Sequence, residues 1–298
     1  MKRIIYGVIQ LISSIKYKLS QYDKCNHPKL TCVLAYHKIL PINSAMPKDK
    51  WCVCSDQFEK QMNYLKENRY VTLTVSKLIE HINKQIPLPS HSVCVTFDDG
   101  YRNNYLYAYP ILKKYGLTAT FYVVTDFINN RTPFAWISPE SDAKKDELLR
   151  FPLSWDEICE MQDNGMEFGS HSHTHPEFNH LNMELIENEI SESYNMLSSH
   201  LKTNVISFVC PFGIFGRSAN LLKNKLIEKG YVAACMGGWG TSYIQTDPFD
   251  LPRLSIYDSD SLLTFSLKIN GHMDWLKGVY SWWRSASTIW GESKHVKT

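Results

Sequence analysis

The chain has 298 residues and a formal net charge of +2, with 21% charged and 13% aromatic residues. This length is sufficient to bury a large core in one or two domains. The small net charge and the lack of a long basic run argue against nucleic-acid binding.

Eight cysteines are spread along the chain without the C-x-x-C pairs of a zinc ribbon. We expect mostly free, buried thiols in a reducing compartment. A disulfide from Cys25 or Cys32 to Cys52 or Cys54 is the alternative.

Residues 1–29 form a basic and apolar N-terminal segment. Lys2 and Arg3 precede the apolar run 4–12, which is about half as long as a spanning helix needs. No small-residue cleavage site follows it. We expect an uncleaved amphipathic segment that lies at a membrane surface. An ordinary helix packed on the domain is the alternative.

Strands and helices alternate through the first half of the chain. In order, we expect a strand over 31–37, a loop to about residue 50, a helix capped by Ser55, a strand over 70–73, a helix capped by Thr74, a strand over 93–97, and a helix with a boundary at Pro110 that ends at Gly116.

The second half continues this alternation. We expect a strand over 119–124, a polar loop over 126–150, a helix from the cap Ser154 to Gly165, a strand over 166–169, an amphipathic helix over 182–201 with Leu185, Ile186, Ile190, Tyr194 and Leu197 as its apolar stripe, a strand over 205–210, a helix over 218–229, a strand over 231–235 and a last strand after Arg253. The alternation predicts a parallel α/β sheet or barrel in a single domain.

Polar side chains gather where these strands end, which is where parallel α/β folds place their chemistry. Asp98 and Asp99 follow the strand 93–97, and two adjacent carboxylates are unfavourable unless a positive charge lies beside them. His171 and His175 are four residues apart, so one turn or tight loop can direct both rings at one ion, with His173 pointing elsewhere.

Asp99, His171 and His175 therefore make a two-histidine, one-carboxylate set suited to Zn²⁺ or a similar divalent ion. Asp98 is then free to act as the general base. A surface turn without catalytic function is the alternative for Asp98-Asp99-Gly100, because Asp-Gly is a common turn signal.

Several motifs resemble those of the NodB-like polysaccharide deacetylases (carbohydrate esterase family four). The sequence Thr96-Phe97-Asp98-Asp99-Gly100 resembles the first motif of that family, and 171–175 resembles the second. The loop 208–213 is similar to the third motif in the branch that deacetylates poly-N-acetylglucosamine. Residues 34–37 and 251–254 also resemble that branch, so the likeness covers roughly 30–257.

The resemblance implies a distorted (β/α) barrel with fewer than eight strands as a catalytic domain over 30–257. It implies Asp98 as base and Asp99, His171 and His175 as ligands of a divalent ion, with Zn²⁺ first and Co²⁺ or Ni²⁺ as alternatives. The backbone N–H of Phe212 would help to bind the oxyanion. We assign Pro211 and Tyr101 to the substrate side with it.

Two positions depart from the family pattern. Val209 stands where classical members carry an arginine that orients the base, and Arg253 is our substitute for it. The late Leu-x-x-His motif that supplies the general acid is also missing. His37, at the end of the first strand, is our candidate acid, and His272 is the alternative. The alternative for His37 is a buried histidine with a structural role only.

Residues 258–298 form a tryptophan-rich extension with helical spacing and interspersed Lys and Arg, which favours a membrane interface. A helix that caps the barrel is the alternative. We expect a metal-dependent N-deacetylase of an envelope polysaccharide or its precursor, associated with a membrane and favouring its cytoplasmic face. A barrel that binds carbohydrate without catalysis, or a deacylase of formyl or O-acetyl groups, are the rival functions.

Overall fold

The computed structural model describes residues 30–42, 50–134, 136, 150–203, 206–213 and 216–277. The basic and apolar segment 1–29, and residues 278–298 of the tryptophan-rich extension, lie outside the described residues. In the described part, no helix combines the length and the apolar character that crossing a membrane requires.

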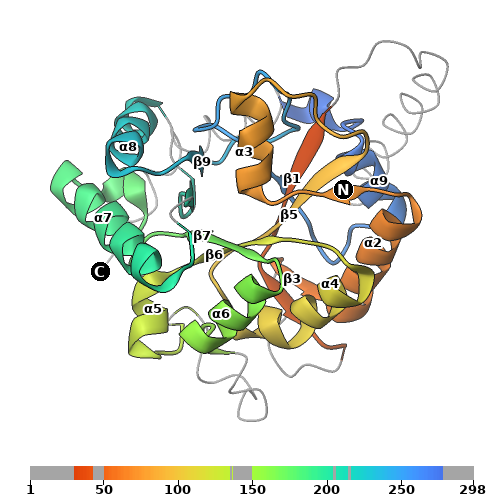
Figure 1. The fold of residues 1–298 in the computed structure, drawn as a ribbon, viewed down its shortest axis with the longest axis horizontal. Helices are drawn as coiled ribbons and strands as arrows, with labels where there is room; N and C mark the ends of the chain where they lie inside the picture. The colour runs from red at the N-terminus through yellow and green to blue at the C-terminus, as the bar shows by residue number, and fades with distance from the viewer. Residues whose placement is uncertain are drawn as a thin grey trace, which may run out of the picture.

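A curled parallel sheet forms the centre of the molecule (Figure 1). Its strands are β1 Thr31–Tyr36, β4 Val71–Thr72, β5 Ser92–Phe97, β6 Thr120–Val123, β7 Glu167–Ser170, β8 Ser207–Val209, β9 Ala233–Cys235 and β10 Leu254–Ser255. Seven of them follow the order β10-β1-β5-β6-β7-β8-β9, and β4 pairs with β5 beside that path. The expected distorted barrel with fewer than eight strands in its wall is confirmed.

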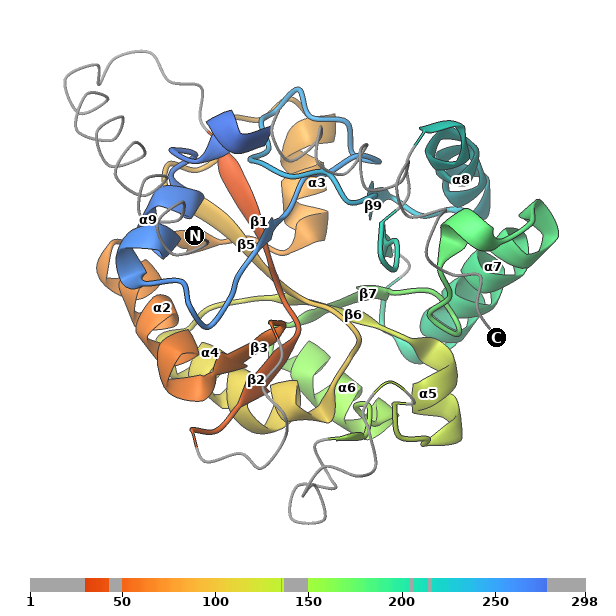
Figure 2. The same cartoon turned by 180° about the vertical axis from the view of Figure 1, so that it is seen from behind.

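Helices surround the strands in both views (Figures 1 and 2). They are α2 Ser55–Glu67, α3 Val75–Asn83, α4 Tyr109–Tyr115, α5 Thr125–Asn130, α6 Trp155–Asp163, α7 Met183–His200, α8 Gly216–Lys229 and α9 Leu262–Ile269. This layered packing buries the strands almost completely: all six residues of β5 are buried. The apolar runs seen in the sequence are therefore strands covered on both faces.

A row of stacked phenylalanines supports the strand ends that bear the polar residues. Phe97 pairs in register with Phe121, and Phe121 with Phe168. The ring centroids lie 4.6 Å apart in the first pair and 5.6 Å apart in the second. The row lies one position before Asp98 on β5, so the candidate site rests on a rigid, fully packed layer.

Most of the expected helix signals are confirmed. The Thr74 side chain accepts from the Lys77 backbone, and Ser154 forms a capping box. Gly116 ends α4 with φ +66°, and Pro110 lies in the first turn of α4 after a π-helical turn. The expectation for Ser55 was wrong by one position, because Cys54 is the N-cap and makes no side-chain capping bond.

Five elements or faces differ from the expectations. Two short parallel strands, β2 Lys38–Leu40 and β3 Cys52–Cys54, flank the expected loop, and α5 begins the stretch read as a polar loop. Leu185 is 50% exposed, while the buried face of α7 includes Glu189 and Ser193. The helix α9, within the expected extension, packs into the core through Phe265. The described cysteines are free thiols.

Candidate active site

Segments far apart in the sequence meet at the carboxyl ends of the strands. His37 follows β1, the Asp98-Asp99 pair follows β5, and the loop 171–175 follows β7. Arg253 immediately precedes β10, whose Leu254 pairs with Leu34 of β1, and its long side chain reaches Asp98. The carboxyl ends of parallel strands share one edge, which brings His37, the two aspartates and the histidine loop together, and Arg253 reaches them from the amino end of β10.

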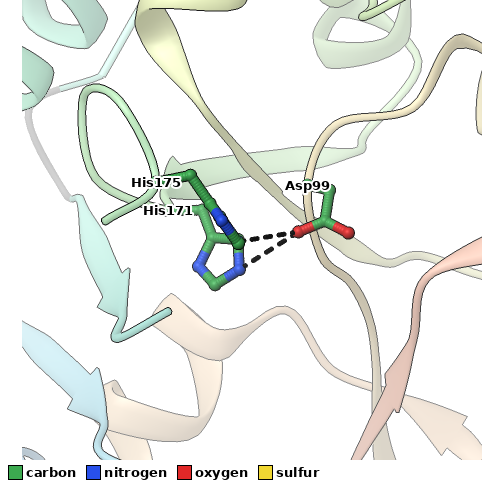
Figure 3. A group of neighbouring side chains, drawn as sticks. All are labelled: Asp99, His171 and His175. Atoms are coloured by element: carbon green, nitrogen blue, oxygen red, sulfur yellow. Dashed lines mark ion pairs between the residues drawn. The ribbon is translucent and has the colours of Figure 1, made fainter. Parts of the chain in front are cut away.

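Asp99, His171 and His175 converge on one point (Figure 3). One carboxylate oxygen, Asp99 Oδ1, lies 3.3 Å from His171 Nε2 and 3.2 Å from His175 Nε2. Asp99 and His171 are buried, and His175 is nearly so. The expected three residues are thus the ones that the structure assembles.

The chemistry of these donors fits a divalent metal ion. The other ring nitrogen of His171, Nδ1, lies 2.8 Å from the Val209 carbonyl oxygen, so Nδ1 bears a proton and Nε2 faces Asp99. A proton on Nε2 binds the Asp99 carboxylate when no metal ion is bound, and the neutral ring would offer its Nε2 lone pair to an ion in that place. Two ligands of a tetrahedral zinc ion lie about 3.3–3.4 Å apart when each is 2.0–2.1 Å from the metal. The two nitrogen–oxygen distances match that edge.

Electrostatics also favour a cation at this point. Burial raises the pKa of Asp99, but hydrogen bonds from His171 and His175 outweigh it and hold that pKa well below its ordinary value. Burial lowers the pKa of His171, yet its hydrogen bond to Asp99 and the charges of both aspartates raise it overall. Positive charge is therefore stabilised between the carboxylate and the rings.

Four residues of the site have a left-handed backbone, which non-glycine residues rarely adopt. They are Asp99 with φ +70°, Ser172 with +67°, His175 with +65° and Phe212 with +58°. Such conformations persist only where their surroundings enforce them, and they cluster at functional sites. Gly100 continues the turn at φ +74°, where a Cβ would lie 2.9 Å from Val123 Cγ1.

Asp98 faces a different partner from its neighbour. Arg253 donates two parallel hydrogen bonds to it, from Nη1 to Oδ1 at 2.6 Å and from Nη2 to Oδ2 at 2.8 Å. Burial raises the pKa of Asp98, but neighbouring positive charge, most of it from Arg253, outweighs burial and lowers that pKa below the ordinary value. A buried carboxylate is thereby kept ionised and fixed in orientation.

Comparison with known proteins identifies this arrangement. The family model for polysaccharide deacetylases matches residues 85–231, a range that includes Asp98, Asp99, His171 and His175. The chain carries a polysaccharide deacetylase domain.

Two curated relatives and one solved structure extend this result. YxkH of Bacillus subtilis is 29% identical over 191 residues, covering 63% of this chain and 60% of that protein. A poly-β-1,6-N-acetyl-D-glucosamine N-deacetylase of Staphylococcus epidermidis is 27% identical over 183 residues, covering 61% of each chain. The chain thus spans about three fifths of the length of these relatives.

The deacetylase PplD of Streptococcus pyogenes, solved with acetate, superimposes with a TM-score of 0.68 at 22% identity. The likeness covers 82% of this chain and 99% of PplD, and it supports the fold.

The departure at Val209 has a structural counterpart within the deacetylase domain. Val209 is buried, and its carbonyl oxygen accepts a hydrogen bond from His171 Nδ1. The guanidinium that the third motif lacks comes instead from Arg253, whose side chain is 15% exposed. Arg253, just before β10, thus binds the proposed base Asp98 from a different strand.

His37 lies beside Asp98. Its Nε2 is 3.7 Å from Asp98 Oδ2, and the Trp51 ring covers it with centroids 4.5 Å apart. Burial lowers the pKa of His37, outweighing the opposing charges of Asp98 and Asp99. The neighbour of the alternative acid His272, Gly271, lies against Leu30 at the amino end of β1, so we keep His37 as the candidate.

The three residues assigned to the substrate side have different positions. Phe212 is 63% exposed, and its ring lies 5.0 Å from that of His175. Pro211 is buried beside it. Tyr101 is only 2% exposed; its backbone pairs with Pro152, and its Oη accepts a hydrogen bond from Trp136 Nε1, so its place on the substrate side stays a prediction.

Trp136 is a residue of the site that sequence reasoning missed. It is 44% exposed, its ring lies 4.7 Å from the His175 ring, and its Nε1 donates to Tyr101 Oη at 2.7 Å. It belongs to a stretch read only as a polar loop, and an isolated tryptophan there gave no signal of its place. Trp136 and Phe212 form two exposed aromatic walls beside His175.

Proposed function

We propose that this protein hydrolyses the N-acetyl groups of amino sugars in an envelope polysaccharide or its precursor and releases acetate. The observation that carries this proposal is the pairing of Asp98 with Arg253 directly beside the Asp99–His171–His175 set. Such a site combines a fixed, ionised base with a place for a Lewis acid, which is what amide hydrolysis requires. The name of the staphylococcal relative supports the substrate class.

Asp99, His171 and His175 would hold a divalent ion, with Zn²⁺ first and Co²⁺ or Ni²⁺ as alternatives. Bound there, the ion would polarise the acetyl carbonyl and make a water molecule more acidic. The Val209 carbonyl fixes the His171 tautomer that this role requires. Asp98 is not one of these ligands, so it remains available as the base.

Asp98 accepts the proton of the attacking water. Its two oxygens are both engaged by Arg253, so the carboxylate cannot rotate, and each oxygen retains a further lone pair for the water. The water oxygen bonds to the acetyl carbon, the carbon–nitrogen bond breaks, and acetate leaves. Arg253 acts through Asp98 and is a positioning residue in this scheme.

The sugar amine must gain a proton as it leaves, and we assign this donation to His37. The imidazole is neutral because burial lowers its pKa, so it can receive the proton that Asp98 has taken. The distance of 3.7 Å from Nε2 to Asp98 Oδ2 is longer than a hydrogen bond, so this relay needs a small approach or one bridging water.

The other side of the site suits a sugar. Phe212 and Trp136 both present exposed rings next to His175, and the apolar faces of pyranose rings pack against aromatic side chains. The backbone N–H of Phe212 would donate to the oxyanion. The left-handed conformation of Phe212 holds that exposed residue at the site entrance.

The rival function, a carbohydrate-binding barrel without catalysis, rests on Val209 in place of the expected arginine. Because Arg253 supplies that guanidinium to Asp98, the motive for this rival is removed. A formyl or O-acetyl substrate would use the same residues, and a panel of acylated sugars distinguishes these activities.

The test is acetate release from an N-acetylglucosamine oligomer by wild-type protein and by Asp98→Asn. We expect the substitution to lower kcat by about 10²–10⁴-fold, since that is the usual contribution of a general base. The metal content, measured by elemental analysis, should equal that of wild type. Residual activity within tenfold of wild type would remove Asp98 from the role of base, and inactivity of wild type on every acylated sugar would refute the deacylase.

We also propose that the segment 1–29 attaches the protein to the cytoplasmic face of a membrane, on the strength of its basic and apolar composition. Deleting residues 1–22 should weaken binding to anionic liposomes in a sedimentation assay. Unchanged sedimentation would contradict this role for the segment.

A further inference from the structure

The loop that bears both histidines is attached to α7 by one buried carboxylate. Glu189 Oε2 accepts hydrogen bonds from the backbone N–H of His173 at 2.8 Å and of Thr174 at 2.9 Å, and Oε1 accepts from Thr174 Oγ1 at 2.5 Å. Glu189 is only 8% exposed. A carboxylate withdrawn from water in this way is stable because charge-assisted bonds from the loop replace its hydration.

The remaining amides of the loop are also held by side chains. Ser172 N donates to Ser170 Oγ at 3.1 Å, and His175 N donates to Ser172 Oγ at 2.9 Å. Ser170 Oγ in turn donates to Ser193 Oγ, one turn after Glu189 on α7. Every backbone N–H from 172 to 175 therefore has a side-chain acceptor, and Glu189 supplies two of the four.

The opposite edge of the loop rests on α5. The backbone N–H groups of Thr125 and Asp126 donate to the carbonyl oxygens of Ser172 and His173, at 3.4 and 3.0 Å. The His173 ring turns the same way, with Nδ1 2.9 Å from Thr125 Oγ1, which confirms that it points away from His171 and His175. The loop is thus clamped between the two helices.

This clamp enforces a backbone that the loop would not adopt by itself. Ser172 and His175 have φ values of +67° and +65°, and these two left-handed residues flank the pair of amides bound by Glu189. Because L-residues disfavour this region, losing the clamp would let the loop relax and draw His175 away from His171 and Asp99.

We propose that Glu189 is a positioning residue that pre-forms the metal site by holding the 171–175 loop in its ligand-presenting conformation. This inference rests on the metal-binding role proposed for Asp99, His171 and His175. The side-chain hydrogen bonds of Glu189 go to His173 and Thr174, and none goes to the side chain of a proposed ligand. It acts on the backbone between the two histidines, and α7 thereby becomes part of the support of the site.

The test is metal affinity in the full-length protein, measured by Co²⁺ titration against a competing chelator with the absorption spectrum as readout. We expect Glu189→Ala to weaken Co²⁺ binding by about 10–100-fold, as substitutions that support metal ligands from outside commonly do. The matched control is Glu192→Ala, because Glu192 is an exposed carboxylate on the same helix. It should bind within twofold of wild type.

Glu189→Gln should restore part of the affinity, because its amide oxygen can still accept from the two backbone N–H groups. A folded Glu189→Ala protein, by circular dichroism, with wild-type affinity and spectrum would overturn the proposal. Should that variant not fold, Glu189→Leu replaces it, because leucine fills the buried space without offering any acceptor to the two backbone N–H groups; wild-type affinity in Glu189→Leu would then overturn the proposal. Failure of wild type to bind Co²⁺ is a separate outcome that refutes the metal site itself.

Discussion

Two carboxylates at opposite ends of the parallel sheet, the buried Asp98 and the partly buried Glu167, have opposite surroundings. Asp98 follows β5 at the carboxyl edge, where Arg253 and two histidines face it. Glu167 begins β7 at the amino edge, where it accepts from the Ser76 backbone N–H and side chain and from Thr120 Oγ1 at 3.0 Å. One faces cations, and the other faces neutral donors.

The pKa values of the two groups follow from these partners. At Asp98 the surrounding positive charges outweigh burial, and the pKa is lowered. At Glu167 burial outweighs the hydrogen bonds, and the pKa is raised. Neutral donors can fix a carboxylate in place, but a guanidinium also favours its ionised form. We therefore assign chemistry to Asp98, and to Glu167 the structural task of capping α3.

Removing the cation should produce the largest change after loss of Asp98 itself. We expect Arg253→Ala to lower the free energy of unfolding by about 3–5 kcal/mol, because it leaves Asp98 buried without its partner. Acetate release should fall with it, since the base loses its orientation. Chemical denaturation and an acetate assay measure both effects.

Arg253→Lys is the matched variant, because lysine keeps the charge but cannot form the two parallel bonds. It should retain more stability than Arg253→Ala while still losing activity. Full activity in Arg253→Lys would show that bidentate orientation of Asp98 is unimportant.

Substitution of Glu167, at the amino edge of the sheet, should have a small effect on activity and stability. We expect Glu167→Gln to leave kcat and KM unchanged and to alter the free energy of unfolding at pH 7 by about 1 kcal/mol, because hydrogen bonds to neutral donors are only moderately stabilising. A tenfold fall in activity would remove the distinction between the two ends of the sheet.

The pH dependence of stability gives the finest comparison. Because the pKa of Glu167 is raised in the folded protein, the folded state retains its proton longer than the unfolded state does. This contribution is present below the ordinary value of 4.5 and is lost as pH rises through the folded pKa. Glu167→Gln should lack that loss, so its melting temperature relative to wild type should rise across this interval. A constant difference would contradict the raised pKa.

The sequence was sufficient to predict those parts of the site that local order defines. Asp98, Asp99 and His171 directly follow apolar strands, and the parallel topology then brings strand ends together, so motif and fold gave the same answer. Arg253 could be proposed because it opens the last strand. Its contact with Asp98 depends on the β10–β1 pairing, which no local pattern encodes.

The roles of residues that depend on tertiary contacts could not be predicted from the sequence. The apolar stripe of α7 pointed to Leu185, but the buried face is rotated toward Glu189 and Ser193, which have polar partners in another loop. Tyr101, which we assigned to the substrate side, follows the left-handed turn at Asp99 and Gly100 and is 2% exposed, and no local pattern indicated this burial. Trp136 takes the exposed position above it.

The central claim is that a divalent ion held by Asp99, His171 and His175 supports hydrolysis of an N-acetyl sugar. The most direct measurement is acetate release from an N-acetylglucosamine oligomer by the full-length protein before chelation, after chelation and after return of Zn²⁺, Co²⁺ or Ni²⁺. We predict loss of activity on chelation and recovery with at least one of these ions. Acetate release that is indifferent to chelation would contradict the account.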